Sequence, residues 1–137
     1  MPDRAQILDI IDRAYAARAR GDKETVARIW APGAVYQLAG ETSLIPAFPA
    51  GPGDAGETVS SIIDLIRFHH LEQLDAIVEG HRAAILWRVT FSVGNGPVGT
   101  TGLYDLWQFD EEGRPSSLLQ FVDTALLRDM LGQAGLQ

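Results

Sequence analysis

A carboxylate interrupts an apolar row in the second half of the sequence. Residues 100–109 alternate in polarity as a strand does, and one face carries Leu103, Trp107 and Phe109. Asp105 lies on that same face. Burial raises the pKa of a carboxyl group, and a buried carboxyl must be hydrogen-bonded or protonated. Asp105 is therefore the first candidate for chemistry, and a structural acid paired with an arginine or a backbone amide is the alternative.

The other titratable side chains are weaker candidates. His69 and His70 are adjacent near the end of a predicted helix, and His81 lies in a turn, so their spacing is not that of metal ligands. We expect no metal site. Asp123 precedes the last predicted helix and is interpreted as its N-cap. If a general base exists, Asp123, His69 and His70 are the candidates.

Charge and composition exclude several classes of function. The 137 residues carry a formal net charge of -7 and include no cysteine. An acidic chain without a basic patch is not expected to bind nucleic acid or an anionic membrane, and thiol chemistry is excluded. The amino terminus lacks the pattern of a signal peptide, and no apolar stretch is long enough to span a bilayer. We expect one cytoplasmic domain, 1–137.

Helical spacing of apolar residues predicts three helices in the first half of the chain. They are 3–20, which Gly21 ends, a short helix that Asp22 caps, and 56–68. The segment 39–55 contains three prolines among several glycines, so no regular element is expected there. An ordered loop of this length is predicted to be a lid or rim over a cavity, with disorder as the alternative.

The second half is mostly strand. The strands predicted there are 71–79, 82–93, 100–109 and 118–122, and one earlier short strand is predicted at 34–38. The odd-numbered face of 82–93 is expected to be buried, and a last helix, ended by Gly132, follows Asp123. This order predicts an α+β fold in which the sheet curls around the helices as a cone with an apolar pocket. The outer sheet face, which includes Tyr104 and Leu106, is a candidate homodimer surface.

Three blocks of the sequence resemble a known family. They are RAYAARARGDKETVARIWAPGAV, VEGHRAAILWRVTF and LYDLWQFDEEGRPSSLLQFVDTALLRDML. In this order they resemble the NTF2-like superfamily, in its SnoaL-like polyketide cyclase and ketosteroid isomerase branch. The resemblance implies an NTF2-like cone, with three N-terminal helices packed in a strongly curved, mostly antiparallel sheet and a short C-terminal helix.

The resemblance also assigns roles to individual residues. Asp105 matches the neutral aspartic acid that ketosteroid isomerases use as an oxyanion donor. Tyr15 lies within one position of that family's oxyanion tyrosine. Leu38 stands where the isomerases carry their proton-shuttling aspartate, and Ile63 and Asp64 stand where they carry aromatic residues. Steroid isomerisation itself is therefore not expected.

A second branch, limonene epoxide hydrolase, is similar in part. Asp123 matches an acid at the end of its final strand. Its Arg-x-Asp pair falls on Arg88 and Thr90, so the partner carboxylate is missing. Both residues are expected on the outer face, and epoxide hydrolysis is therefore not expected.

The leading hypothesis is a cofactor-independent isomerase, cyclase or related lyase that acts on a hydrophobic, carbonyl-bearing small molecule. Asp105 and Tyr15 are the expected catalytic residues. The expected substrate-binding residues are Trp30, Leu38, Ile63, Trp87, Val89, Leu103, Trp107, Leu118, Gln120 and Val122. The alternatives are a non-catalytic binding module for an apolar metabolite, which Leu38 favours, and an assembly role through the outer sheet face. No cofactor is expected, and a homodimer is.

Overall fold

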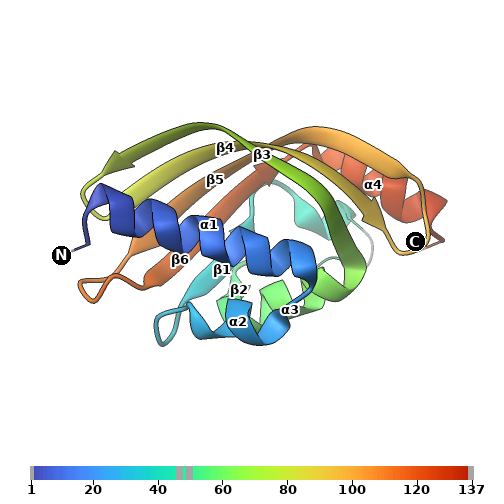
Figure 1. Ribbon diagram of the computed structural model, residues 1–137. Helices are drawn as coiled ribbons and strands as arrows, with labels where there is room; N and C mark the ends of the chain where they lie inside the picture. Colours follow the sequence, from blue (N-terminus) through green and yellow to red (C-terminus); the bar gives the residue numbers. More distant parts are fainter. Residues whose placement is uncertain (1, 46–47, 49–50, 136–137) are drawn as a thin grey trace.

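The computed structural model describes residues 2–45, 48 and 51–135, and shows a curved sheet arching over helices (Figure 1). The helices are α1 (Arg4–Arg20), α2 (Lys23–Arg28), α3 (Ala55–Leu65) and α4 (Thr124–Gln133), with a 3-10 turn at Thr42–Leu44. The strands are β1 (Val35–Leu38), β2 (Gly53–Asp54), β3 (Ile66–Glu79), β4 (Arg82–Val93), β5 (Val98–Phe109) and β6 (Pro115–Val122). The predicted α+β class is confirmed.

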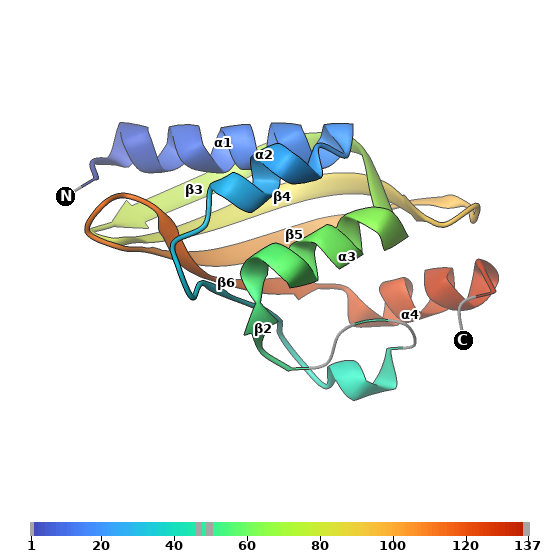
Figure 2. The same ribbon diagram turned by 90° about the horizontal axis from the view of Figure 1, so that it is seen from below.

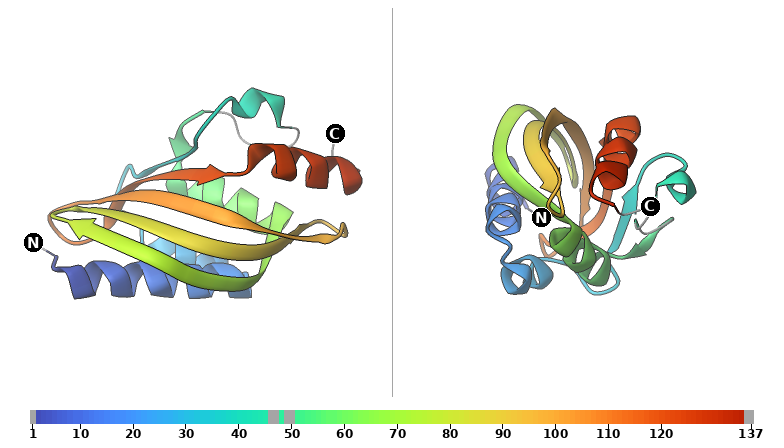
Figure 3. Two further views of the ribbon diagram at one scale, coloured as in Figure 1. Left: turned by 90° about the horizontal axis from the view of Figure 1, so that it is seen from above. Right: turned by 90° about the vertical axis from the view of Figure 1, so that its right-hand side faces the viewer.

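The six strands form one sheet in the order β2-β1-β6-β5-β4-β3. β1 runs parallel to β6, and the other neighbours are antiparallel. Two register shifts in β3, after Phe68 and after Gln73, bend that edge of the sheet. α1, α2 and α3 cover the concave face, and α4 lies at one end of the cone (Figures 2 and 3). The interior between sheet and helices is where the site forms.

α1 begins and ends at the residues that its sequence indicates. Asp3 and Gln6 form a reciprocal capping box at its start, and Gly21 ends it in the left-handed conformation, at φ 72. Its buried stripe includes Ile7, Ile11 and Ala14, at the spacing of one helix face. This stripe packs α1 onto the concave side of the sheet.

The third helix is shorter than predicted. It ends at Leu65, and β3 begins at Ile66 and pairs with the end of β4. Apolar spacing continues past Leu65, but sheet pairing determines the structure there. His69 and His70 therefore lie on β3 and not at the end of a helix.

The segment after β1 is more regular than predicted. It contains the 3-10 turn and β2, a two-residue strand that pairs with β1. Ile45 is buried and Phe48 is half-buried, whereas Leu44 is exposed. The predicted lid also includes 46–47 and 49–50, which lie outside the described residues.

The long strands follow the predicted pattern. The odd-numbered residues of β4 from Ala83 to Val93 are buried, as predicted. Asp123 caps α4 by accepting a hydrogen bond from the backbone N–H of Leu126 at 3.0 Å, which confirms its predicted N-cap role. Among the helices of the described residues, none combines the length and apolar character needed to cross a membrane.

Candidate functional site

An apolar cavity lies between the concave face of the sheet and the helices. It contains about 80 Å³ of space that the centre of a water molecule could occupy, which is room for several waters or a small organic molecule. α1, α2, α3, the sheet and α4 all contribute to its wall. The predicted site residues on this wall are Tyr15, Trp30, Leu38, Val89, Leu103, Trp107, Leu118, Gln120 and Val122.

Two predicted substrate-binding residues do not line the cavity. α3 faces it with Val59 and Ile62, so Ile63, one position further along the helix, is rotated away by about 100°. Trp87 is buried behind the wall and packs against Tyr15, with ring centroids 4.4 Å apart. Its indole contacts Asp105, so Trp87 supports the site from behind.

Asp105 is fully buried at the back of the cavity wall, and it does not itself line the cavity. Three donors converge on its Oδ2 atom: the hydroxyl of Tyr15, the indole N–H of Trp87 at 3.1 Å and that of Trp107 at 3.3 Å. Its Oδ1 atom is buried without a partner among the described residues. Burial raises the pKa of Asp105 to about 6, although hydrogen bonds from Tyr15 and other neighbours oppose that rise.

Tyr15 connects Asp105 to the cavity. Its hydroxyl accepts a hydrogen bond from Gln120 Nε2 at 2.8 Å, and the hydroxyl of Tyr36 donates to Gln120 Oε1 at 2.6 Å. The register of β5 and β6, which pairs Asp105 with Gln120, brings these groups together. Burial, followed by the charge of Asp105, raises the pKa of Tyr15 well above its ordinary value. The result is one connected chain of hydrogen bonds from Tyr36 through Gln120 and Tyr15 to Asp105, and the first three of these residues lie on the cavity wall.

The three candidate bases lie away from the cavity. His69 is bonded to Ser92 Oγ at 2.7 Å, His70 is exposed, and Asp123 is the helix cap. None of them is on the cavity wall, and among the described residues that wall contains no carboxylate and no imidazole. Leu38 is buried on the cavity wall. Tyr15 and Trp107 are the wall residues that donate hydrogen bonds to the buried carboxylate of Asp105. The phenol of Tyr15 can accept a proton on its oxygen as it releases its own, whereas the indole N–H of Trp107 is a donor alone.

Two polar residues of the wall, Tyr36 and Arg18, were not predicted from the sequence. Arg18 continues the stripe of Ile7, Ile11 and Ala14 along α1, and this spacing is a signal that could have identified it. Burial lowers the pKa of Arg18 to about 10, so its guanidinium is charged at neutral pH.

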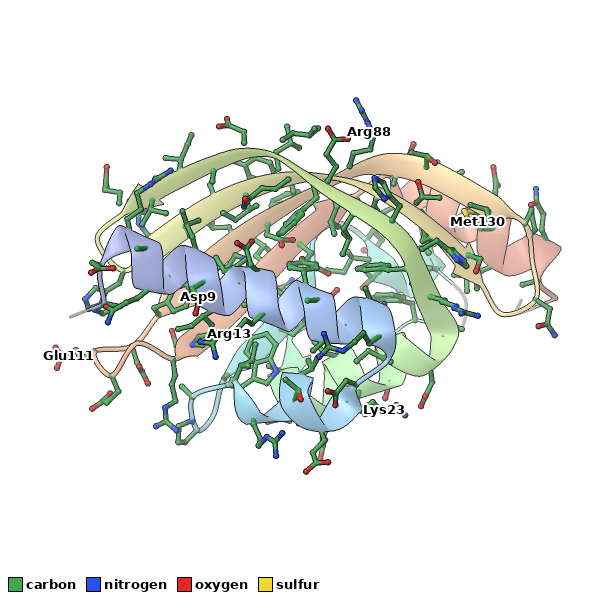
Figure 4. All side chains as sticks on the ribbon, viewed as in Figure 1. Asp9, Arg13, Lys23, Arg88, Glu111 and Met130 are labelled. Carbon is green, nitrogen blue, oxygen red and sulfur yellow. The ribbon has the colours of Figure 1, made fainter. Side chains whose placement is uncertain are left out.

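The remaining polar groups of interest are Arg88 and possible metal ligands. The side chain of Arg88 projects outward from the convex face of the sheet, on the side opposite the cavity (Figure 4), and forms an ion pair with Glu72 at 3.6 Å. It is therefore not placed for epoxide hydrolysis in the cavity. Within the described part of the chain, no group of three or more His, Cys, Asp or Glu residues is arranged to hold a metal ion.

Comparison with known proteins gives a family and a fold. The SnoaL-like domain family matches residues 11–123. A candidate isomerase from Rhodopseudomonas palustris is 21% identical over 100% of both chains, with a TM-score of 0.73. TerC, co-crystallised with polyporic acid, is 13% identical over 93% of this chain and 98% of its own, with a TM-score of 0.75.

An LEH-like epoxide hydrolase from M. tuberculosis is 13% identical over 97% of this chain and 92% of its own, with a TM-score of 0.70. Identities this low show a shared fold alone. Comparison with curated protein sequences gives no match. The match over residues 11–123 shows that the chain belongs to the SnoaL-like domain family, and its fold is NTF2-like.

Proposed function

We propose that the protein is a cofactor-independent isomerase, cyclase or related lyase that acts on a hydrophobic, carbonyl-bearing small molecule in the cavity. One observation carries this proposal: the phenol of Tyr15 lies on the wall of an apolar cavity and is hydrogen-bonded to the buried Asp105. An apolar cavity with a few converging polar groups and a perturbed carboxyl group is typical of a small-molecule site. TerC, co-crystallised with polyporic acid, shares this fold.

In the proposed mechanism Tyr15 contacts the substrate and Asp105 acts through it. When Asp105 is ionised, the phenol donates to Asp105 and accepts from Gln120, which leaves one lone pair for the substrate. The C–H bond beside the substrate carbonyl breaks, its proton passes to the Tyr15 oxygen, and the phenol proton passes to Asp105. The electron pair of the C–H bond forms an enolate.

The enolate then determines the product. Return of the proton from Tyr15 to a different carbon completes an isomerisation and restores ionised Asp105. Attack of the enolate carbon on a second carbonyl of the same molecule forms a ring, and the proton returns to the new alkoxide. Both routes regenerate the starting enzyme without a cofactor, and a pKa of about 6 suits Asp105 to this exchange near neutral pH.

Exchange of carbon-bound protons tests the proposal without knowledge of the natural substrate. 2-Tetralone, a bicyclic ketone, is incubated with the protein in D₂O, and the loss of its α-proton signal is followed by NMR. We expect wild type to accelerate the exchange, and Tyr15→Phe and Asp105→Asn to reduce the acceleration by roughly 100-fold or more. The exposed Tyr104→Phe is the matched control and is expected to leave the rate unchanged.

A second candidate function is a binding module that holds an apolar metabolite without changing it. The aliphatic side chain of Leu38 at the isomerase base position favours this candidate. If 2-tetralone binds, as measured by quenching of the cavity tryptophans, but its exchange is no faster than in buffer, the binding module is the correct function and the enzyme proposal is wrong.

We also propose that the outer face of the sheet forms a homodimer contact. Tyr104 and Phe121 are both exposed there and pack edge to face, with ring centroids 6.4 Å apart. An exposed aromatic pair on a sheet face is suited to a contact between two copies of the chain.

A further inference from the structure

Arg18 is a buried cation without a partner on the cavity wall. It is 7% exposed, its Nη2 atom has no hydrogen-bond partner, and its guanidinium takes part in no ion pair among the described residues. Its guanidinium makes a cation–π contact with the ring of Phe68, whose centroid lies 4.0 Å from Cζ. A buried charge without a protein partner is costly, so an anionic group of a ligand is a partner that Arg18 is suited to bind.

Trp30 provides a second, independent observation on the same wall. Its indole Nε1–H is buried and has no acceptor among the described residues. Most buried polar groups are hydrogen-bonded, so two unpaired groups beside one cavity need an explanation. Both groups are donors, and the amide oxygen of Gln120, an acceptor on this wall, is already bonded to Tyr36. The unused hydrogen-bonding capacity of Arg18 and Trp30 therefore matches an acceptor-rich ligand.

Asp105 does not neutralise Arg18. The hydrogen bonds to Asp105 come from Tyr15 and two indoles, and no contact joins its carboxylate to the guanidinium. The two charged groups of the interior thus differ in their surroundings. Three protein donors converge on Oδ2 of the carboxylate, although its Oδ1 atom has no partner, whereas the guanidinium has no hydrogen-bonding partner among the described residues and can bind a ligand group in the cavity. Because arginine binds carboxylates and similar anions in planar geometry, it is well suited to hold one.

We propose that Arg18 and Trp30 form an anion-binding subsite, so that the ligand is a hydrophobic molecule that carries a carboxylate or another anionic oxygen. This inference rests on the proposed function in one respect, that the cavity is the ligand site, and it adds the charge of the ligand. Arg18 follows Tyr15 by three residues on α1, so the two side chains lie on one helix face. An anion held by Arg18 therefore positions the rest of the ligand against Tyr15.

A matched pair of probes tests the subsite. 2-Naphthoate and its neutral analogue 2-naphthamide have the same rings, and only the first is an anion. Binding is measured by quenching of tryptophan fluorescence and by the shift in Tm. We expect wild type to bind 2-naphthoate at least tenfold more tightly than 2-naphthamide, and Arg18→Gln to abolish that preference while it keeps the affinity for 2-naphthamide. Arg20→Gln is the matched control, because Arg20 is on the same helix with its side chain 61% exposed.

The same ligands separate this inference from the proposed function. Equal binding of the two probes by wild type, or loss of affinity for both probes in Arg18→Gln, overturns the anion subsite, even if 2-tetralone exchange is catalysed. A preference for 2-naphthoate that depends on Arg18, together with 2-tetralone that binds but is not exchanged, supports the subsite and overturns the enzyme proposal. Failure of both probes to bind overturns the inference, because the cavity is then not a ligand site of this kind.

Discussion

Replacing Asp105 with asparagine should change how the stability of the protein depends on pH. Folding raises the pKa of Asp105 from its ordinary value of 3.8 to about 6, so between these values the folded state binds the proton more tightly than the unfolded state does. The contribution of Asp105 to the free energy of unfolding is thus most favourable below about pH 4 and is lost as the pH rises through about 6. A difference of about two pKa units corresponds to about 3 kcal/mol.

Asparagine has nearly the shape of aspartate and does not titrate. We expect the difference in the free energy of unfolding, Asp105→Asn minus wild type, to increase by about 3 kcal/mol between about pH 4 and about pH 7. Urea denaturation followed by tryptophan fluorescence measures it. Any hydrogen bond that the asparagine amide lacks gives an offset at every pH, and the other carboxylates cancel in the subtraction.

A control residue should give the opposite trend. Hydrogen bonds from the side chain and backbone of Thr25 lower the pKa of Asp22, so its contribution is present at neutral pH and is lost on acidification. For Asp22→Asn, which keeps the helix cap, the difference from wild type should therefore fall as the pH rises. A difference for Asp105→Asn that is flat, or that falls in the same way, would refute a raised pKa at this site.

Three further predictions concern the cavity wall and the outer face. Arg18→Met should raise the free energy of unfolding of the unliganded protein by about 1–3 kcal/mol in urea denaturation, because it removes an unpaired buried charge. A loss of stability would show that Arg18 is paired within the unliganded protein. Leu38→Asp places a carboxylate on the cavity wall and should accelerate 2-tetralone exchange even in the Tyr15→Phe background. The buried carboxylate should also lower the free energy of unfolding by about 2–5 kcal/mol. No gain in exchange would show that the ligand does not bind beside Leu38. If the proposed homodimer forms through the outer face, Phe121→Asp at its exposed position should give a monomer in light scattering. A monomeric wild type would refute the dimer contact.

Much of the fold was predictable because local rules and tertiary packing agree. The apolar stripe and Gly21 determine the extent of α1, and alternation alone identifies the buried face of β4. The same alternation placed Asp105 in the interior, and the structure finds it fully buried. These features depend on residues close together in sequence, so the sequence is enough to predict them.

The rest of the site depends on contacts that the sequence does not reveal. Pairing with β4 ended α3 at Leu65, although apolar spacing continues beyond it. Ile62 lies on the cavity wall, and Ile63, one position further along the helix, is rotated away from it. Trp87 is buried behind the wall, where its indole donates to Asp105. Arg18 occupies a stripe position that usually holds an apolar residue, and only the three-dimensional structure shows that its guanidinium has no partner.

The pH dependence of 2-tetralone exchange tests the proton transfer through Tyr15 and Asp105 most directly. Asp105 accepts a proton only when it is ionised, so the rate with wild type should rise with pH to a plateau, with its midpoint near the pKa of about 6. The Asp105→Asn variant should lose that midpoint along with the acceleration. A rate that rises with hydroxide concentration alone, or a midpoint that persists in Asp105→Asn, would contradict the role of Asp105 as the proton acceptor.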